Sequence, residues 1–178
     1  MKIRWFLAIS LVMWISGCAS MNIEQFEDKS PAFSIESYFL GKTRAWGIFE
    51  DRFGDLRREF TVDISGTLEQ DTLVLDEHFE YTDGETDRRV WRIRILGDGH
   101  YEGSADDITG VATGVARGNA LNWQYNMDLP VNGSTWNVHF DDWMFLQSDD
   151  VLINRATVSK WGFEVGTVTL FFQRDEQQ

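Results

Sequence analysis

From residue 43 onward, the chain alternates apolar and polar residues in short segments, and this period of two constrains the fold more than any other feature. The clearest segment covers residues 120–129, where Leu121, Trp123, Tyr125, Met127 and Leu129 alternate with four polar residues. Successive side chains of a β-strand point to opposite faces of its sheet, so this pattern predicts a strand with one buried face. The sequence therefore indicates an antiparallel all-β domain.

Ten segments carry this pattern, and short turns rich in Gly, Asn and Asp separate them. They cover residues 43–51, 56–66, 72–81, 89–96, 100–105, 108–117, 120–129, 134–146, 151–160 and 163–172. Short turns favour hairpins between successive strands, and closing the sheet removes its exposed edges. We therefore expect an antiparallel meander of about ten strands closed into a lipocalin-like barrel. A β-sandwich is the alternative.

The first 18 residues have the layout of a secretory signal. Lys2 and Arg4 precede an apolar run over residues 5–15, and Ile15-Ser16-Gly17-Cys18 follows. The run is about half of the ~20 residues that a membrane-spanning helix needs. A cysteine in this place resembles the bacterial lipobox, at which the thiol is acylated and the chain is cut. We therefore predict lipidation of Cys18. An Asp after the cysteine would retain a lipoprotein at the inner membrane, but the residue here is Ala19. We therefore expect the protein to be anchored at the periplasmic face of the outer membrane.

These features divide the chain into a signal peptide at residues 1–17, a lipidated tether at 18–34 and a single barrel domain at 35–178. Cys18 is the only cysteine, so we expect neither disulfides nor a cysteine metal site. The chain holds 16 Lys and Arg against 29 Asp and Glu, and this acidity disfavours binding to nucleic acid.

No motif for catalysis is recognisable in the sequence. A nucleophile elbow, a phosphate-binding loop and paired catalytic carboxylates are all missing. His139 and Asp141 share one strand face, but no third metal ligand follows at a suitable spacing, and we interpret His78, His100 and His139 as surface residues. We therefore expect no metal, no cofactor and no enzymatic activity.

Three charged residues interrupt apolar strand faces, namely Glu77, Asp142 and Arg155. A buried charge needs a partner. If Ser148 and Asp149 form the turn between residues 134–146 and 151–160, Asp142 lies opposite Arg155, which predicts an inward-facing ion pair. A register that keeps the apolar residues of segments 73–81 and 89–95 on one face, with Asp76 across from Arg92 on the other, places Leu75 opposite Ile93 and Glu77 opposite Trp91.

The inward faces supply a set of candidate ligand-binding residues. They are Trp123, Tyr125, Trp136, Phe140, Asp142, Arg155 and Glu77. A further face, with Gly110, Ala112, Gly114 and Ala116, is nearly all small residues. It either points inward and leaves space in the barrel, or points outward beneath another element.

Six short stretches resemble a bacterial lipoprotein family, domain of unknown function 3833, over nearly the whole mature chain. They are residues 47–54, 75–79, 83–85, 101–105, 140–144 and 154–156. This family has no established activity, so the resemblance implies no catalytic residue.

The sequence thus favours an outer-membrane-anchored periplasmic lipoprotein that binds or carries an apolar, lipid or fatty-acid-like ligand in its barrel. The alternative is a structural or assembly lipoprotein whose filled barrel binds a protein partner. A cavity of a few hundred cubic ångströms lined by Trp and Phe would favour the first hypothesis, whereas a filled interior would favour the second.

Overall fold

The computed structural model describes residues 21–131 and 133–175, and ten antiparallel strands dominate this part of the chain. The strands are β1 (Gly41–Asp51), β2 (Leu56–Glu69), β3 (Thr72–Tyr81), β4 (Thr86–Gly97), β5 (His100–Ser104), β6 (Ile108–Arg117), β7 (Ala120–Val131), β8 (Ser134–Leu146), β9 (Val151–Lys160) and β10 (Phe163–Arg174). A short helix, α1 (Ile35–Phe39), precedes them, and two 3₁₀ turns cover Ile23–Phe26 and Ser148–Asp150.

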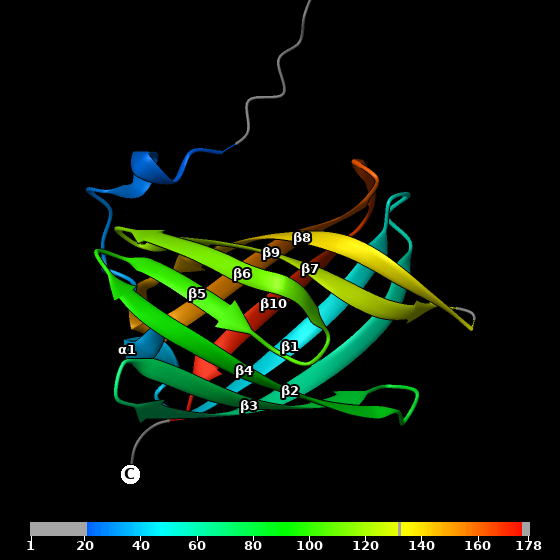
Figure 1. The fold of residues 1–178 in the computed structure, drawn as a ribbon, viewed down its shortest axis with the longest axis horizontal. Helices are drawn as coiled ribbons and strands as arrows, with labels where there is room; N and C mark the ends of the chain where they lie inside the picture. Colours follow the sequence, from blue (N-terminus) through cyan, green and yellow to red (C-terminus); the bar gives the residue numbers. More distant parts are fainter. Residues whose placement is uncertain (1–20, 132, 176–178) are drawn as a thin grey trace, which may run out of the picture.

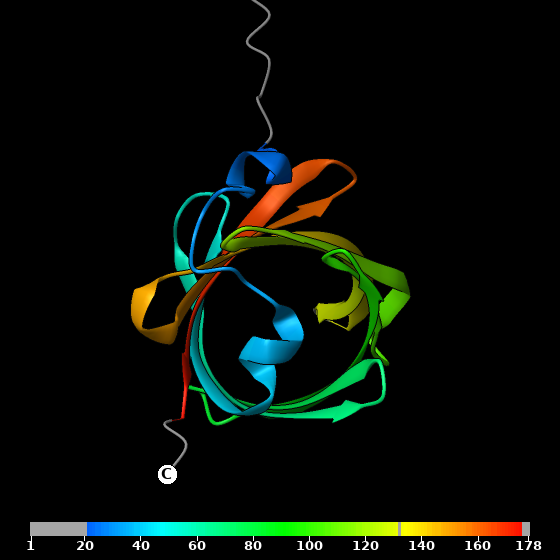
Figure 2. The same cartoon turned by 90° about the vertical axis from the view of Figure 1, so that its left-hand side faces the viewer.

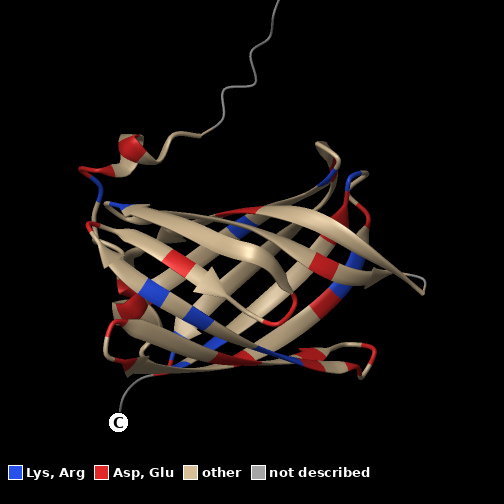
Figure 3. Ribbon diagram, viewed as in Figure 1, with Lys and Arg blue, Asp and Glu red and all other residues tan. Residues whose placement is uncertain are grey.

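Each strand pairs with its sequence neighbours, and β1 pairs with β10 to close the barrel (Figure 1). The predicted ten-stranded antiparallel barrel is confirmed, and the β-sandwich alternative is wrong because the sheet has no free edge. Apolar residues of the alternating segments point inward, as Leu73, Leu121 and Leu152 show, each with 0% exposure. Charged residues lie mainly on the outer wall and in the turns (Figure 3), where cross-strand pairs such as Arg44–Asp63 and Arg92–Glu69 form.

The predicted register between β3 and β4 is wrong by two residues. Leu75 lies opposite Trp91 rather than Ile93, and Glu77 lies opposite Arg89 rather than Trp91. The turn at residues 82–85 sets this register, through hydrogen bonds from the Tyr81 amide to the Glu85 carbonyl and from the Gly84 amide to the Tyr81 carbonyl. A shift of two residues leaves every side chain on its predicted face.

The predicted register between β8 and β9 is wrong by one residue, and this has a larger effect. Asp142 lies opposite Ala156, while Arg155 lies opposite Trp143 and is exposed on the outer wall. The connection is longer than the predicted two-residue turn, because the Gln147 amide bonds the Val151 carbonyl across the 3₁₀ turn Ser148–Asp150. A slip of one residue moves a side chain to the opposite face of the sheet, so the predicted Asp142–Arg155 ion pair does not form.

Helix α1 covers one end of the barrel (Figure 2). Ser34 caps it by accepting a hydrogen bond from the Ser37 amide, and Ile35, Tyr38 and Phe39 are buried. The Tyr38 hydroxyl donates to the carbonyls of Asp150 and Phe172, which ties the helix to the strand ends below it.

The residues before α1 also contact the barrel, although we expected a tether there. Phe26 packs against Trp143 and Phe145 on the outer wall, with ring centroids 6.1 and 5.5 Å apart. Phe33 is 5% exposed and belongs to the core, and its amide donates to the Gly118 carbonyl. All ten strands, α1 and the buried core lie within residues 33–174, so a chain lacking residues 1–18 keeps the entire barrel.

Of the small-residue face of β6, Ala112, Gly114 and Ala116 are buried and point inward, whereas Gly110 is exposed where the pairing with β7 shifts register. The Trp123 side chain fills the space beside Gly114. A Cβ atom added at Gly114 would lie 2.3 Å from Trp123 Cε3, and one added at Gly103 in β5 would lie 2.6 Å from Trp123 Cζ2. Glycine is therefore needed at both positions for the indole ring to lie flat against the barrel wall.

Candidate functional site

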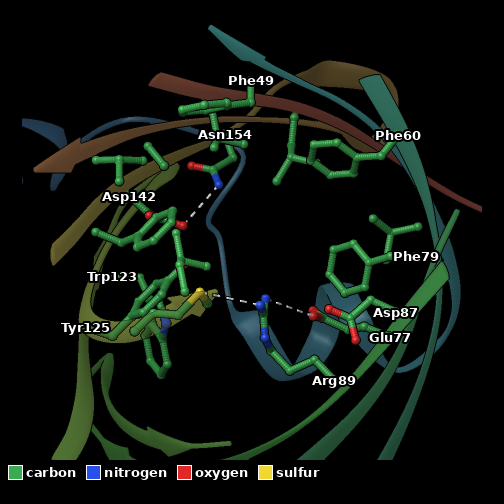
Figure 4. Close-up of a pocket in the computed structure, with 18 of the residues that line it drawn as sticks. Phe49, Phe60, Glu77, Phe79, Asp87, Arg89, Trp123, Tyr125, Asp142 and Asn154 are labelled. Atoms are coloured by element: carbon green, nitrogen blue, oxygen red, sulfur yellow. Dashed lines mark hydrogen bonds and ion pairs between the residues drawn. The ribbon is translucent and has the colours of Figure 1, made fainter. Parts of the chain in front are cut away.

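The barrel encloses a cavity of about 580 Å³. Aromatic and aliphatic side chains from the strands line most of it (Figure 4). Ile35 and Phe39 of α1 line one end. At the other end Asp87, Pro130 and Trp136 both line the cavity and are exposed to solvent, so the cavity reaches the surface there. Its volume falls within the range of small-molecule binding sites, about 300–1,000 Å³.

Six of the seven predicted ligand-binding residues line this cavity. They are Glu77, Trp123, Tyr125, Trp136, Phe140 and Asp142. Arg155 does not line it, because the register of β9 turns its side chain outward.

An aromatic cluster forms one wall of the cavity. Tyr125 stacks on Phe140 with ring centroids 4.9 Å apart and an interplanar angle of 5°. Trp91 meets both Tyr125 and Trp123 edge to face, at 5.4 and 5.6 Å. Such packing fixes the rings in place, so this wall is a preformed apolar surface.

The partner of Glu77 is Arg89, which lies directly across from it on β4. The Arg89 guanidinium is 3.8 Å from Glu77 Oε2 and 2.8 Å from Asp107 Oδ2, and its side chain is 19% exposed. Burial raises the pKa of Glu77 to about 7, while the charge of Arg89 acts in the opposite direction. We did not single out Arg89 from the sequence, although its period-two spacing with Trp91 and Ile93 places it on the inward face.

Asp142 and Asn154 form a second polar group, on the opposite wall from Glu77 and Arg89 (Figure 4). Asp142 is 5% and Asn154 1% exposed, and Asn154 Nδ2 donates to Asp142 Oδ2 at 3.2 Å. Burial raises the pKa of Asp142 to about 7, against the effect of the Asn154 hydrogen bond. The Asp142 carboxyl group therefore keeps its proton to a higher pH than an exposed aspartate does.

The histidines lie outside this site. His78 is exposed, and His100 and His139 are half-buried, with none of the three lining the cavity. Within residues 21–131 and 133–175, no three His, Cys, Asp or Glu side chains come close enough to hold a metal ion. In the same part of the chain, no helix is long and apolar enough to cross a membrane.

Large apolar side chains project into solvent around the open end of the barrel. Phe53, in the turn between β1 and β2, is 76% exposed, while Trp161 and Phe163, at the turn between β9 and β10, are 87% and 73% exposed. Two cations lie over these rings: Arg52 is 4.7 Å from the Phe53 centroid and Lys160 is 4.7 Å from that of Trp161. We call Phe53, Trp161 and Phe163 the mouth aromatics.

A family model described as "Protein of unknown function (DUF3833)" matches residues 12–174. The chain belongs to this family. The resemblance deduced from the six stretches is thus confirmed for the DUF3833 family itself. No curated protein matches the chain.

Solved structures share the fold, among them these two. One is an S-type phycobiliprotein lyase from Guillardia theta, with 11% identity, a TM-score of 0.57, and coverage of 89% of this chain and 95% of that one. The other is a protein of unknown function from the DUF3598 family of Nostoc punctiforme, with 13% identity, a TM-score of 0.55, and coverage of 83% of this chain and 51% of that one. At these identities the likeness concerns the fold alone, and it confirms the lipocalin-like type of barrel.

The lyase corrects one expectation. We inferred from the missing motifs that the chain is not an enzyme, yet a protein with the same barrel fold is named a lyase. The missing sequence motifs therefore do not exclude catalysis in a barrel of this kind.

Proposed function

We propose that this DUF3833 protein binds an apolar small molecule inside its barrel. The observation that carries the proposal is the 580 Å³ cavity, which aromatic and aliphatic side chains line and which reaches the surface at one end. A solid interior would have favoured the alternative of a purely structural lipoprotein. Apolar walls with a few fixed polar groups are typical of sites that bind ligands through the hydrophobic effect and orient them by hydrogen bonds.

We further propose that the protein is a lipoprotein, anchored through Cys18 at the periplasmic face of the outer membrane, and that its ligand derives from lipid. Cys18 lies outside the described residues, and the support for its lipidation is the lipobox-like sequence Ile15-Ser16-Gly17-Cys18. The mouth aromatics support an exchange of ligand with a bilayer, because exposed aromatic side chains next to Arg52 and Lys160 are suited to the membrane interface.

Binding can be tested by titrating protein that lacks residues 1–18 with the apolar fluorophore 1,6-diphenylhexatriene. We expect one molecule per chain, with energy transfer from Trp91 and Trp123, whose rings line the cavity. Val158 is inward-facing and 2% exposed, so Val158→Trp should fill part of the cavity and weaken binding. Val111 is 60% exposed, so Val111→Trp is the matched control and should bind normally.

Melting of both variants distinguishes a filled cavity from an unfolded chain. A wild-type protein that does not bind the fluorophore, or a folded Val158→Trp variant that binds it as tightly as wild type, would contradict the proposal.

The anchor is tested separately, by Cys18→Ala in the full chain. We expect this variant to remain uncut or to lose its acyl-dependent membrane attachment. Normal maturation and membrane partitioning of Cys18→Ala would contradict the lipoprotein proposal.

A further inference from the structure

Two buried oxygens on one wall of the cavity have no hydrogen-bond partner among the described residues. They are Asp142 Oδ1 and Asn154 Oδ1. The partner oxygen of the carboxylate, Asp142 Oδ2, is bonded to Asn154 Nδ2, so the pair is held in place while one acceptor on each residue stays free. A buried acceptor without a donor costs about 1–3 kcal/mol, so a ligand that supplies donors here gains affinity.

No free cation from residues 21–131 or 133–175 faces this wall. Arg58 and Arg89 are the two basic residues that line the cavity, and both are paired with carboxylates: Arg58 with Asp83 and Glu85, and Arg89 with Glu77 and Asp107. The acidic residues of the lining are more numerous, with Asp51, Glu77, Asp87 and Asp142. Acidic groups in the cavity lining therefore outnumber basic ones, and neither basic group is free to pair with a ligand.

The aromatic wall adds to this preference. Trp123 lies directly opposite Asp142 in the β7–β8 pairing, and its ring is packed against Trp91. Aromatic faces attract cations through the ring quadrupole, most strongly when water is excluded. A carboxylate beside aromatic rings is a combination that suits an ammonium group, and the carboxylate also accepts from a hydroxyl.

We propose that Asp142 and Asn154 bind the hydrogen-bond-donating head of the apolar ligand, a hydroxyl or an ammonium group. This inference rests on the proposed ligand-binding function and narrows it. A free fatty acid, which the sequence suggested as one ligand class, is disfavoured, because its carboxylate supplies no donor to the free acceptor Asn154 Oδ1.

Four probes with the same twelve-carbon chain test the head group: dodecylamine, 1-dodecanol, 1-methoxydodecane and dodecanoate. The affinity of each probe is measured by its displacement of 1,6-diphenylhexatriene from protein lacking residues 1–18. About 0.15 M salt is present to screen the charge of the acidic surface. We expect 1-dodecanol to bind about tenfold more tightly than its methyl ether, and dodecylamine about tenfold more tightly than dodecanoate, because only the donors satisfy the two free oxygens. Whichever of the amine and the alcohol binds more tightly identifies the head as ammonium or hydroxyl.

A matched pair of variants locates the effect. Asp142→Asn and Asp141→Asn replace a carboxyl group by an amide at adjacent residues on opposite faces of β8. Asp141 accepts from Asn122 and Gln124 on the outer wall. Asp142→Asn should lower the affinity for dodecylamine about tenfold, whereas Asp141→Asn should change this affinity by less than about twofold. Asp142→Asn keeps the size of the buried side chain and an oxygen that can accept from Asn154, so the variant is expected to fold.

Two outcomes overturn the inference. In the first, dodecanoate or the methyl ether binds as tightly as dodecylamine and 1-dodecanol. In the second, Asp142→Asn binds dodecylamine with the affinity of wild type. These outcomes differ from failure of the proposed function, in which the fluorophore itself does not bind wild-type protein.

Discussion

The buried carboxyl group of Asp142 predicts that the protein becomes less stable as the pH rises. Its pKa is about 7 in the folded barrel against 3.8 in the ordinary environment of an unfolded chain. Between these values the folded state holds a proton that the unfolded state releases. Because the folded state binds more protons, the free energy of unfolding falls with increasing pH across this window.

The magnitude follows from the size of the shift. A difference of about three pKa units, at about 1.4 kcal/mol per unit, corresponds to about 4 kcal/mol, and about 3 kcal/mol of this is lost between about pH 5 and pH 8. Burial also raises the pKa of Glu77, which adds to the trend in the same direction. The pKa values of Asp51, Asp76 and Asp83, in contrast, are lowered in the folded protein. The stability that these groups contribute is lost only as the pH falls below about 4, outside the range tested.

The assay is urea unfolding of protein lacking residues 1–18, at about pH 5 and about pH 8, for wild type, Asp142→Asn and Asp141→Asn. Wild type and Asp141→Asn should lose several kcal/mol over this range, and Asp142→Asn should lose about 3 kcal/mol less, because it has no carboxyl group to ionise. Parallel pH dependences for wild type and Asp142→Asn would refute the reasoning, since they would mean that water solvates the carboxylate in the folded barrel.

Further predictions concern other parts of the barrel. Arg89→Met should destabilise the protein by about 3 kcal/mol in urea unfolding at about pH 8, because it leaves Glu77 without its partner, whereas Arg155→Met on the outer wall should change stability by less than about 0.5 kcal/mol. Gly114→Ala should destabilise by about 1–3 kcal/mol, since its Cβ would clash with the Trp123 ring, and Trp123→Leu should relieve most of this penalty in the double variant. Serine at the mouth aromatics Phe53 and Trp161 should slow transfer of 1,6-diphenylhexatriene from the protein to phosphatidylethanolamine vesicles, whereas serine at Ile153 and Phe171 should not; equal rates would show that the mouth does not meet the bilayer.

The sequence predicted the strands well, because the alternation of apolar and polar residues within each strand shows which of its side chains are buried. Segments such as 120–129 needed no long-range information, since an inward residue at every second position is a local signal. Helix α1 was missed because five residues are too few to establish a helical period, and its capping serine is common in loops as well.

The register between strands could not be predicted, and the site depends on it. The β8–β9 connection contains Asp149 and Asp150 with positive φ angles of 61° and 57°, a conformation that the sequence Ser-Asp-Asp does not specify. One additional residue in that connection placed Asn154, instead of Arg155, beside Asp142. The inward position of Asp142 was correctly predicted from alternation, whereas its partner depended on turn geometry.

The most direct test of the central claim, that the barrel holds an apolar molecule, is mass spectrometry of small molecules extracted from protein purified out of its native membrane. We expect about one apolar molecule per chain, retained in wild type and lost when Val158→Trp fills the cavity. Wild-type protein that carries no such molecule, or that carries the same molecules in the same amount as folded Val158→Trp, would contradict the account.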